Sequence, residues 1–379
     1  MGDSDLVVDC DFPGGNILVD AVNGNTISVR PDLRDTTIEW FYWYFRVRNC
    51  GGRSLQIHFP ERNLLGGRGP ATSKDRGATW QWLGEECMCD SYFDYSVPTD
   101  VDEVRFSMGM PYLQDNLATF LKRFAGFPSL RQAVLCTSRK GRPVEFLHLG
   151  CQANLADYRV VLTARHHACE MMASYVLEGV MEEALSGSET GHWLLSHAAF
   201  LVVPFVDKDG VEDGDQGKCR YPHDHNRDYE DALFPEVRAL MRLVPEWSGG
   251  KLDFFLDLHC PSLQGSSDET IFLVGGPEED LWQEVGRFSD LLELACHGPL
   301  PYRRNNNMPW GKEWNTSEDH EPGTKASSTW AGEFTGTRFA SGIEIPYANA
   351  GGVEVNAETA RAFGHDLSQA ICLYLREEK

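Results

Sequence analysis

The chain has 379 residues, of which 42% are apolar and 24% charged, and its 34 basic and 57 acidic residues give a formal net charge of −23. The length predicts two or three domains, and the composition is that of a globular protein rather than a disordered, collagenous or coiled-coil one. Because such an acidic surface repels phosphate backbones and anionic lipid, we expect neither nucleic acid nor membrane as a partner.

The sequence also indicates a compartment. It contains no run of about 18 apolar residues, and its start lacks the apolar stretch of a secretory signal. Eleven cysteines, an odd number without a short framework, indicate reduced thiols in a cytoplasm. A mature secreted form without its signal would look the same, but we expect a cytoplasmic protein.

The first part of the chain has the pattern of β-structure. Short alternating or aromatic-rich segments, separated by turns rich in Gly and Asn, predict strands at 16–19, 26–30, 39–47, 55–59 and 104–108. Without a convincing long helix among them, they predict an all-β sandwich domain over residues 1–112. The aromatic run in 39–47 could form a ligand platform, but we favour packing in the core.

The pattern changes after residue 112, where strands and helices alternate. Strands are predicted at 160–162, 200–204, 254–258 and 343–345, and helices at 117–124, 168–185, 232–243, 279–296 and 358–375. This alternation predicts an α/β domain over residues 113–379, with a mixed, largely parallel sheet flanked by helices. The region 303–328 is rich in Gly, Asn and Ser and has the size of an active-site loop.

Four polar clusters follow apolar strand segments, which is where α/β sheets bind ligands. In the first, His167 and Glu170 are three residues apart at a predicted strand-to-helix turn, so both can reach one cation. In the second, His259 follows the strand at 254–258 and supplies a third ligand. Two His and one Glu leave a fourth position for water, as in catalytic zinc sites. Alternatively, His167 and Glu170 belong to an ordinary helix surface, and His259 is a hydrogen-bonded histidine of the core.

The remaining two clusters suggest substrate binding and proton transfer. Asn226 and Arg227 together suit a terminal carboxylate, although a loop salt bridge would use the same residues. Glu344 lies between two isoleucines, an apolar setting that raises the pKa of a carboxyl group toward the range of a general base. A buried ion pair is the alternative for Glu344.

Taken in order, these clusters resemble the zinc carboxypeptidases. More narrowly, the first third of the chain resembles the β-domain of the cytosolic carboxypeptidases, at 12–16 (FPGGN), 40–47 (WFYWYFRV) and 110–112 (MPY). The resemblance covers essentially the whole chain. It implies that His167, Glu170 and His259 bind one zinc ion per chain, that Glu344 is the general base and acid, and that Asn226 and Arg227 grip the substrate's terminal carboxylate.

The chain departs from the family pattern in several places. The family's carbonyl-polarising Arg matches Arg220 first and Lys218 second, because the register of that loop is ambiguous. His166 could compete with its neighbour for the metal. No Tyr lies between 303 and 344, so the family's loop hydroxyl would come from Tyr302 or Tyr347 or be absent; Trp310, Trp314 and Trp330 occupy this stretch. Lys325 and Arg338 would either select an acidic terminal residue or be surface charges.

The resemblance implies a zinc-dependent metallocarboxypeptidase that hydrolyses the carboxy-terminal peptide or isopeptide bond of a peptide or protein. Zinc would activate a water molecule and Glu344 would take its proton. One alternative is a related amidase or deacylase that acts on an acyl amino acid or a cell-wall peptide. Another is a binding module that keeps the pocket without turnover.

Overall fold

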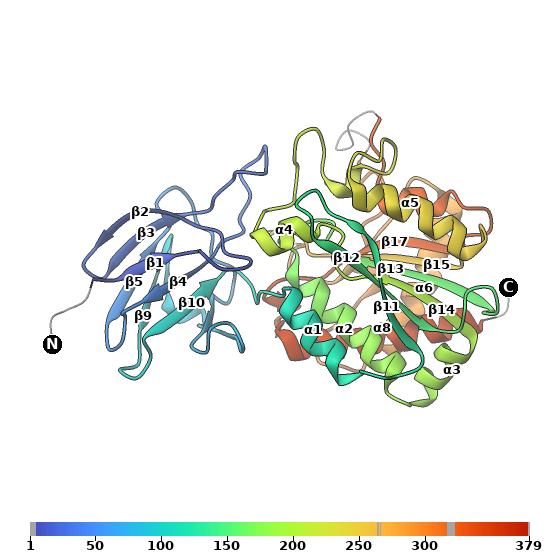
Figure 1. The fold of residues 1–379 in the computed structure, drawn as a ribbon, viewed down its shortest axis with the longest axis horizontal. Helices are drawn as coiled ribbons and strands as arrows, with labels where there is room; N and C mark the ends of the chain where they lie inside the picture. The colour runs from blue at the N-terminus through green and yellow to red at the C-terminus, as the bar shows by residue number, and fades with distance from the viewer. Residues whose placement is uncertain (1–4, 264, 266, 317–322, 378–379) are drawn as a thin grey trace.

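The computed structural model describes residues 5–263, 265, 267–316 and 323–377. The strands of the first 107 residues form a β-rich lobe, shown on the left of Figure 1, and the rest of the chain forms a larger lobe with helices around a central sheet. All eleven cysteines are unpaired. In the described part of the chain, no helix has the length and apolar character needed to cross a membrane.

Two sheets build the β-rich lobe. In spatial order, the first contains β1 (Val7–Asp9), β4 (Tyr44–Arg48), β10 (Glu103–Ser107), β6 (Ala71–Ser73) and β7 (Gln81–Trp82). The second contains β2 (Leu18–Asn23), β3 (Thr26–Arg30), β5 (Ser54–His58), β9 (Tyr92–Ser96) and β8 (Met88–Cys89), with the short helix η1 (Glu85–Cys87) before β8. Phe106 of the first sheet meets Phe93 of the second, with ring centroids 5.2 Å apart. The predicted all-β sandwich is therefore confirmed.

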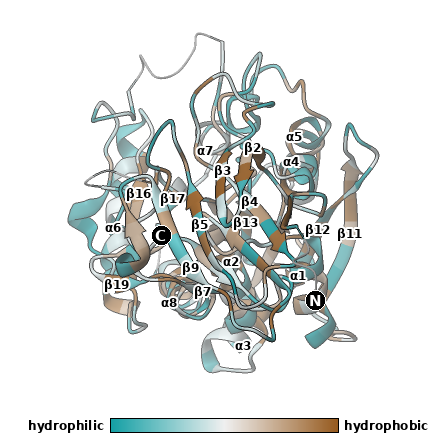
Figure 2. Cartoon of the chain, turned by 90° about the vertical axis from the view of Figure 1, so that its left-hand side faces the viewer, coloured by the Kyte–Doolittle hydropathy of each residue, from teal (hydrophilic) through white to brown (hydrophobic). Residues whose placement is uncertain are grey.

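Alternation along the strands builds the core of this lobe. In β3 and β5, every second residue is buried, while the residues between them are half-buried or exposed. Ile27 and Ile57 have no exposed surface. Figure 2 shows hydrophobic colouring on these strands and on β4. The period of two therefore predicts both the strands and the face that they bury.

The aromatic run 39–47 is only partly a strand. It was predicted as one element, but β4 begins at Tyr44. Before it, the backbone of Tyr42 pairs with a side chain rather than with a strand: its N–H donates to Gln216 Oε1 at 2.8 Å and its carbonyl accepts from Gln216 Nε2 at 2.9 Å. These contacts hold the loop 214–217 against the β-rich lobe.

A seven-stranded mixed sheet forms the centre of the larger lobe. Its spatial order is β11 (Leu130–Thr137), β12 (Pro143–Gly150), β14 (Ala198–Val203), β13 (Tyr158–Ala164), β15 (Phe254–His259), β17 (Phe339–Glu344) and β16 (Phe272–Val274). The four strands β14, β13, β15 and β17 are parallel, and the flanking strands are antiparallel. Helices cover both faces of the parallel strands, which explains their unbroken apolar runs. The predicted α/β fold is confirmed.

The helices divide between the two faces. One face carries α2 (Met171–Leu185), α6 (Glu279–Ala295) and α8 (Ala357–Arg376), and the other carries α5 (Pro235–Ser248) and α7 (Ser327–Gly332). At the periphery lie α1 (Gln114–Arg123), α3 (Glu189–His197), α4 (Lys208–Asp213), η2 (His225–Arg227) and η3 (Arg304–Asn306), and a small hairpin joins β18 (Asn349–Ala350) to β19 (Val353–Glu354). Helices α2 and α8 touch at two glycines, because a Cβ on Gly179 would lie 2.1 Å from Arg361 O and one on Gly364 would lie 2.2 Å from Val176 O.

Several predicted elements differ in extent from the structure. The helix predicted from residue 168 begins at Met171, because residues 165–170 form the turn that carries the first polar cluster. Strands β11 and β12 and helix α3 were not predicted. The edge strand β11 is mostly exposed or half-buried, so its sequence lacks the apolar run of a central strand. The short helix α4 was not predicted either; Asp207 caps it by accepting a hydrogen bond from Gly210 N.

Candidate metal centre and substrate pocket

The three predicted metal ligands converge at the carboxyl ends of two neighbouring strands. His167 and Glu170 lie in the turn between β13 and α2, and His259 is the last residue of β15, which runs parallel to β13. Glu170 bridges the two imidazoles: Oε1 lies 2.8 Å from His167 Nδ1 and Oε2 lies 2.7 Å from His259 Nδ1. Their ligand atoms lie within 4.8 Å of one another, so one ion can contact all three.

The turn that carries His167 is shaped by its neighbours. Arg165 has a positive φ of 62° and is buried, and its guanidinium donates to the carbonyls of Ala168 and Tyr112. On the other side, the loop 214–217 packs against the turn so closely that a Cβ on Gly217 would lie 2.0 Å from Ala168 N. Gly217 also has a φ of +78°, which favours glycine.

Electrostatics keep Glu170 ionised. Burial by itself would raise the pKa of Glu170, but the imidazoles of His167 and His259 outweigh burial and hold this pKa well below its ordinary range. Burial opposes the charged form of His259, yet Asp257 and Glu170 raise its pKa well above the ordinary value. An ionised carboxylate between two imidazoles matches the donor set of a catalytic zinc site.

A carboxylate lies behind each imidazole. Asp257 Oδ2 is 2.6 Å from His259 Nε2, and Asp224 Oδ1 is 3.5 Å from His167 Nε2. Carboxylates in this position fix the orientation of metal-binding imidazoles and raise their basicity. Neither acid was assigned a role from the sequence. Asp257 and His259 are two residues apart on a strand, so they share a face, and that spacing was a usable signal.

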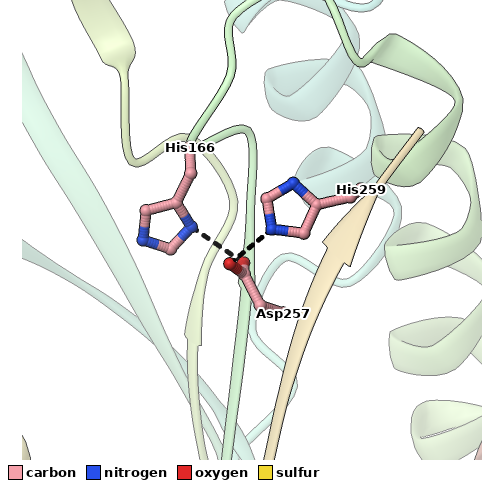
Figure 3. A group of neighbouring side chains, drawn as sticks. All are labelled: His166, Asp257 and His259. Carbon is pink, nitrogen blue, oxygen red and sulfur yellow. Dashed lines mark hydrogen bonds and ion pairs between the residues drawn. The ribbon is translucent and has the colours of Figure 1, made fainter. Parts of the chain in front are cut away.

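Asp257 also contacts His166, and Figure 3 shows the carboxylate between the two imidazoles. His166 Nδ1 lies 2.8 Å from Asp257 Oδ1, while Tyr229 Oη lies 2.7 Å from His166 Nε2. His166, Asp257 and His259 are thus close enough to form a second, overlapping metal group. Asp257, however, also accepts hydrogen bonds from Thr163 Oγ1 and Ser327 Oγ. Its oxygens are already saturated, so the group with His167 and Glu170 fits a metal better.

Glu344 lies beside the candidate metal ligands. It ends β17 and is paired in register with His259. Its Oε2 is buried and has no hydrogen-bond partner among the described residues. Burial raises the pKa of Glu344 to about 7; His259 opposes this shift and Glu170 adds to it. A buried carboxyl group with this pKa can exchange a proton near neutral pH.

These groups face one cavity. His167, His259 and Glu344 line it, together with Lys218, Asn226 and Arg227. Asn226 Oδ1 accepts from Ser327 N at 3.0 Å, which orients the amide. Arg227 Nη1 donates to Asn226 O, and Lys218 Nζ lies 6.0 Å from the Trp40 ring centroid. Among the described residues, no carboxylate lies within ion-pairing distance of either cation.

Arg220 points elsewhere. It was the first choice for the carbonyl-polarising residue, but it does not line the cavity. Its guanidinium lies 3.0 Å from Asp35, 2.7 Å from Asp207 and 3.1 Å from Asp215. Burial opposes its charge, but these carboxylates raise the pKa of Arg220 above its ordinary value. Of the two alternatives that the sequence left open, the geometry therefore favours Lys218.

The other open alternatives also have defined positions. Tyr302 and Tyr347 are buried outside the cavity, whereas Trp310 and Trp314 line it. Lys325 and Arg338, the two residues considered from the sequence for binding an acidic terminal side chain, do not line the cavity.

Comparisons with known proteins indicate which proteins the chain resembles. The sequence model of the zinc carboxypeptidase family matches residues 117–265. Mouse cytosolic carboxypeptidase 3 is 25% identical over 312 residues, which is 72% of this chain and 30% of that protein. Cytosolic carboxypeptidase 6 of Caenorhabditis elegans is 22% identical over 323 residues, or 76% and 69% of the two chains. The chain spans about a third of the length of the first curated relatives.

Solved structures share the fold. A metallo-carboxypeptidase from Burkholderia cenocepacia superposes with a TM-score of 0.80 at 20% identity, covering 98% of this chain and 99% of that one. A metallo-carboxypeptidase from Pseudomonas aeruginosa, in complex with (2-guanidinoethylmercapto)succinic acid, superposes with a TM-score of 0.77 at 21% identity, covering 98% and 100%.

In sequence, residues 117–265 thus match the zinc carboxypeptidase family, and most of the chain is similar to the cytosolic carboxypeptidases. In fold, nearly the whole chain is similar to metallo-carboxypeptidases. The resemblance predicted from the sequence is confirmed.

Proposed function

We propose that this chain is a zinc-dependent metallocarboxypeptidase that removes the carboxy-terminal residue of a peptide or protein. One observation carries the proposal: the two imidazoles of the His/Glu/His group, the buried carboxyl group of Glu344 and two cations line the same cavity, and neither cation has a carboxylate within ion-pairing distance among the described residues. In a chain of net charge −23, two such cations in a cavity favour a ligand that brings its own carboxylate.

The metal would be one zinc ion, held by His167 Nδ1, His259 Nδ1 and the carboxylate of Glu170. In the structure these atoms contact one another, and Asp224 and Asp257 lie behind the imidazoles. When bound, zinc supplies Lewis acidity, which polarises a carbonyl oxygen and makes a neighbouring water more acidic.

The side chains around this centre divide the remaining work. Glu344 Oε2 has no hydrogen-bond partner within the described ranges of the chain, so it is available to accept a proton from the attacking water and return it to the leaving amine. Lys218 would stabilise the negative charge that develops on the carbonyl oxygen. Arg227 and Asn226 would hold the terminal carboxylate and so restrict cleavage to the end of a chain.

The first test pairs metal analysis with peptide cleavage. The purified, zinc-loaded chain should contain one zinc per chain and should release single residues from the carboxyl end of peptides, as read by mass spectrometry. Glu344→Gln should retain zinc and lose cleavage by about 10²–10⁴-fold, the range for a general acid–base group. Endoproteolytic products, or full activity in Glu344→Gln, would refute the proposal.

Two further proposals concern organisation and location. We propose that residues 1–112 form one domain and 113–379 the catalytic domain, supported by the two-sheet lobe ending at Ser107 and α1 beginning at Gln114. We also propose a cytoplasmic location, supported by the names of the curated relatives. Limited proteolysis and cell fractionation test these proposals.

A further inference from the structure

The charged and histidine side chains among the described lining residues are His167, Lys218, Arg227, Asp257, His259 and Glu344. Apart from these and Asn226, the described part of the wall is uncharged, and we call it the neutral wall. Val274 and Gly342 form part of it, paired across β16 and β17. The rest of this neutral wall comes from the chain after β16, the loop before α7 and α7 itself: Gly275, Gly276, Trp310, Trp314, Asn315, Ala326, Ser328 and Thr329. The wall therefore offers two indole rings, an amide and two hydroxyls to a side chain that enters it.

The two cations of the cavity lie at its border. Lys218 and Arg227 also line a neighbouring cavity of about 200 Å³, whose other walls include Thr37, Tyr221 and Thr324. No residue of the neutral wall lines that second cavity. Lys218 and Arg227 therefore separate the two cavities, and the neutral wall lies away from the second one.

The two basic residues considered from the sequence for an acidic side chain contact other groups. Lys325 Nζ lies 2.8 Å from Glu230 and 2.9 Å from Glu333. Arg338 stacks over the Tyr374 ring at 4.9 Å, on α8. Lys325 is thus paired with two carboxylates, whereas Arg338 Nη1 and Nη2 are buried without a hydrogen-bond partner among the described residues. Neither residue lines the cavity.

The two carboxylates that line the cavity already have partners or a proposed role. Asp257 lines it, but its oxygens are bound by two imidazoles and two hydroxyls. Glu344 is the other carboxylate of the lining, and in the proposed function it handles the reacting proton. Among the described residues, a lysine or arginine side chain against the neutral wall would therefore lack a counter-ion.

We propose that the neutral wall receives the side chain of the substrate's terminal residue and selects an uncharged residue over glutamate, aspartate, lysine or arginine. This inference rests on the proposed carboxypeptidase function and names its substrate class. The physical reason is that a charge taken from water into a wall without a counter-charge loses hydration that neutral groups do not replace.

The sharpest test compares two peptides that end in glutamine and glutamate and are otherwise identical. Their last side chains have nearly the same shape and differ in charge, so the ratio of their kcat/KM values isolates the effect of charge. We expect glutamine to be preferred by about 100-fold, since sites discriminate most strongly where a buried polar group would stay unpaired. A leucine/lysine pair tests the opposite charge in the same way.

Substitutions in the neutral wall test whether this wall determines the charge selectivity. Ser328→Arg adds a cation to the wall and should reverse the preference toward glutamate; Thr329→Lys is a second variant of the same design. Lys325→Gln is the matched control, because its Nζ is paired with Glu230 and Glu333, and it should leave the glutamine/glutamate ratio unchanged.

The outcomes separate the two levels of inference. Cleavage of the glutamate peptide as fast as the glutamine peptide would overturn the selectivity and leave the carboxypeptidase function standing. If cleavage of the glutamate peptide, but not of the glutamine peptide, were then lost in Lys218→Gln or Lys325→Gln, that residue would be the one that binds the acidic side chain. Failure to cleave any peptide, with zinc bound, would overturn the proposed function and the selectivity with it.

Discussion

The loop 214–220 offers a direct test of which cation acts on the substrate. Arg220 and Lys218 are two residues apart, yet only Lys218 lines the cavity. We predict that Arg220→Gln mainly lowers the free energy of unfolding, whereas Lys218→Gln mainly lowers kcat/KM. The two variants remove one positive charge each from the same loop, so each is the control for the other.

The magnitude for Arg220 follows from its surroundings. The side chain is 13% exposed, and its three partners lie 2.7–3.1 Å away with exposures of 1–12%. Asp35 and Asp215 keep other donors, from Gln216 N, Gly217 N and Arg34. Asp207 Oδ1 keeps Gly210 N, but Oδ2 has no partner besides Arg220 among the described residues, so a buried carboxylate would lose its ion pair. Breaking such a pair costs about 3–5 kcal/mol.

For Lys218, the expected effect is on the rate of cleavage rather than on stability. This half-buried side chain has no carboxylate partner among the described residues, so its removal should change stability by no more than about 0.5 kcal/mol. Loss of a group that stabilises a developing oxyanion lowers kcat by about 10²–10³-fold.

Urea unfolding followed by tryptophan fluorescence would measure stability, and peptide cleavage would measure kcat/KM, both on zinc-loaded protein. The decisive result is the pattern across the two variants. An Arg220→Gln protein that unfolds at the wild-type urea concentration but has lost its activity would show that Arg220, and not Lys218, contacts the substrate.

Three further predictions follow from the site and its surroundings. Asp257→Asn should weaken zinc affinity by about 10–100-fold in a chelator competition, because it removes the carboxylate behind His259; unchanged affinity would contradict that role. Zinc at 100 times its Kd should raise the free energy of unfolding by about 2.7 kcal/mol, and Glu170→Gln should abolish most of this gain if Glu170 is a ligand. Burial raises the pKa of Asp215 from 3.8 to about 6, and the charge of Asp35 adds to this shift. Between these two pH values Asp215 is protonated in the folded state and ionised in the unfolded state. The free energy of unfolding should therefore fall by about 3 kcal/mol as pH rises from 4 to 6. Asp215→Asn should remove that slope from the difference between variant and wild-type unfolding curves; a parallel pH dependence would show that Asp215 titrates normally.

Much of the site could be predicted from the sequence because its residues end apolar strands. His259 and Glu344 each follow a run of buried residues, and parallel strands bring such ends to one edge of a sheet. His167 and Glu170 are close in the chain, so their spacing alone brings them together. Periodicity and local spacing were enough to place these residues near one another, whereas their roles were inferred from the resemblance to the zinc carboxypeptidases.

What could not be predicted depends on contacts between distant segments. Nothing in the loop sequence shows that Arg220 turns toward Asp35, which lies 185 residues earlier. The strand predicted from residue 39 stops short because Gln216 takes the backbone partners of Tyr42. The uncharged cavity wall likewise comes from β16, β17 and α7, whose meeting is set by the fold.

The loop that carries Lys218 is braced from outside the larger lobe. Asn16 Nδ2 donates to Gly214 O at 2.7 Å, Gln216 is paired with Tyr42, and Gly217 N donates to Asp35. A shortened chain that began at residue 113 would keep every candidate metal ligand and lose all three braces. Such a chain would be metal-loaded yet slow. Substitutions in the first 45 residues can therefore change turnover from a distance, and exchanging this region between relatives would succeed only if the loop were exchanged with it.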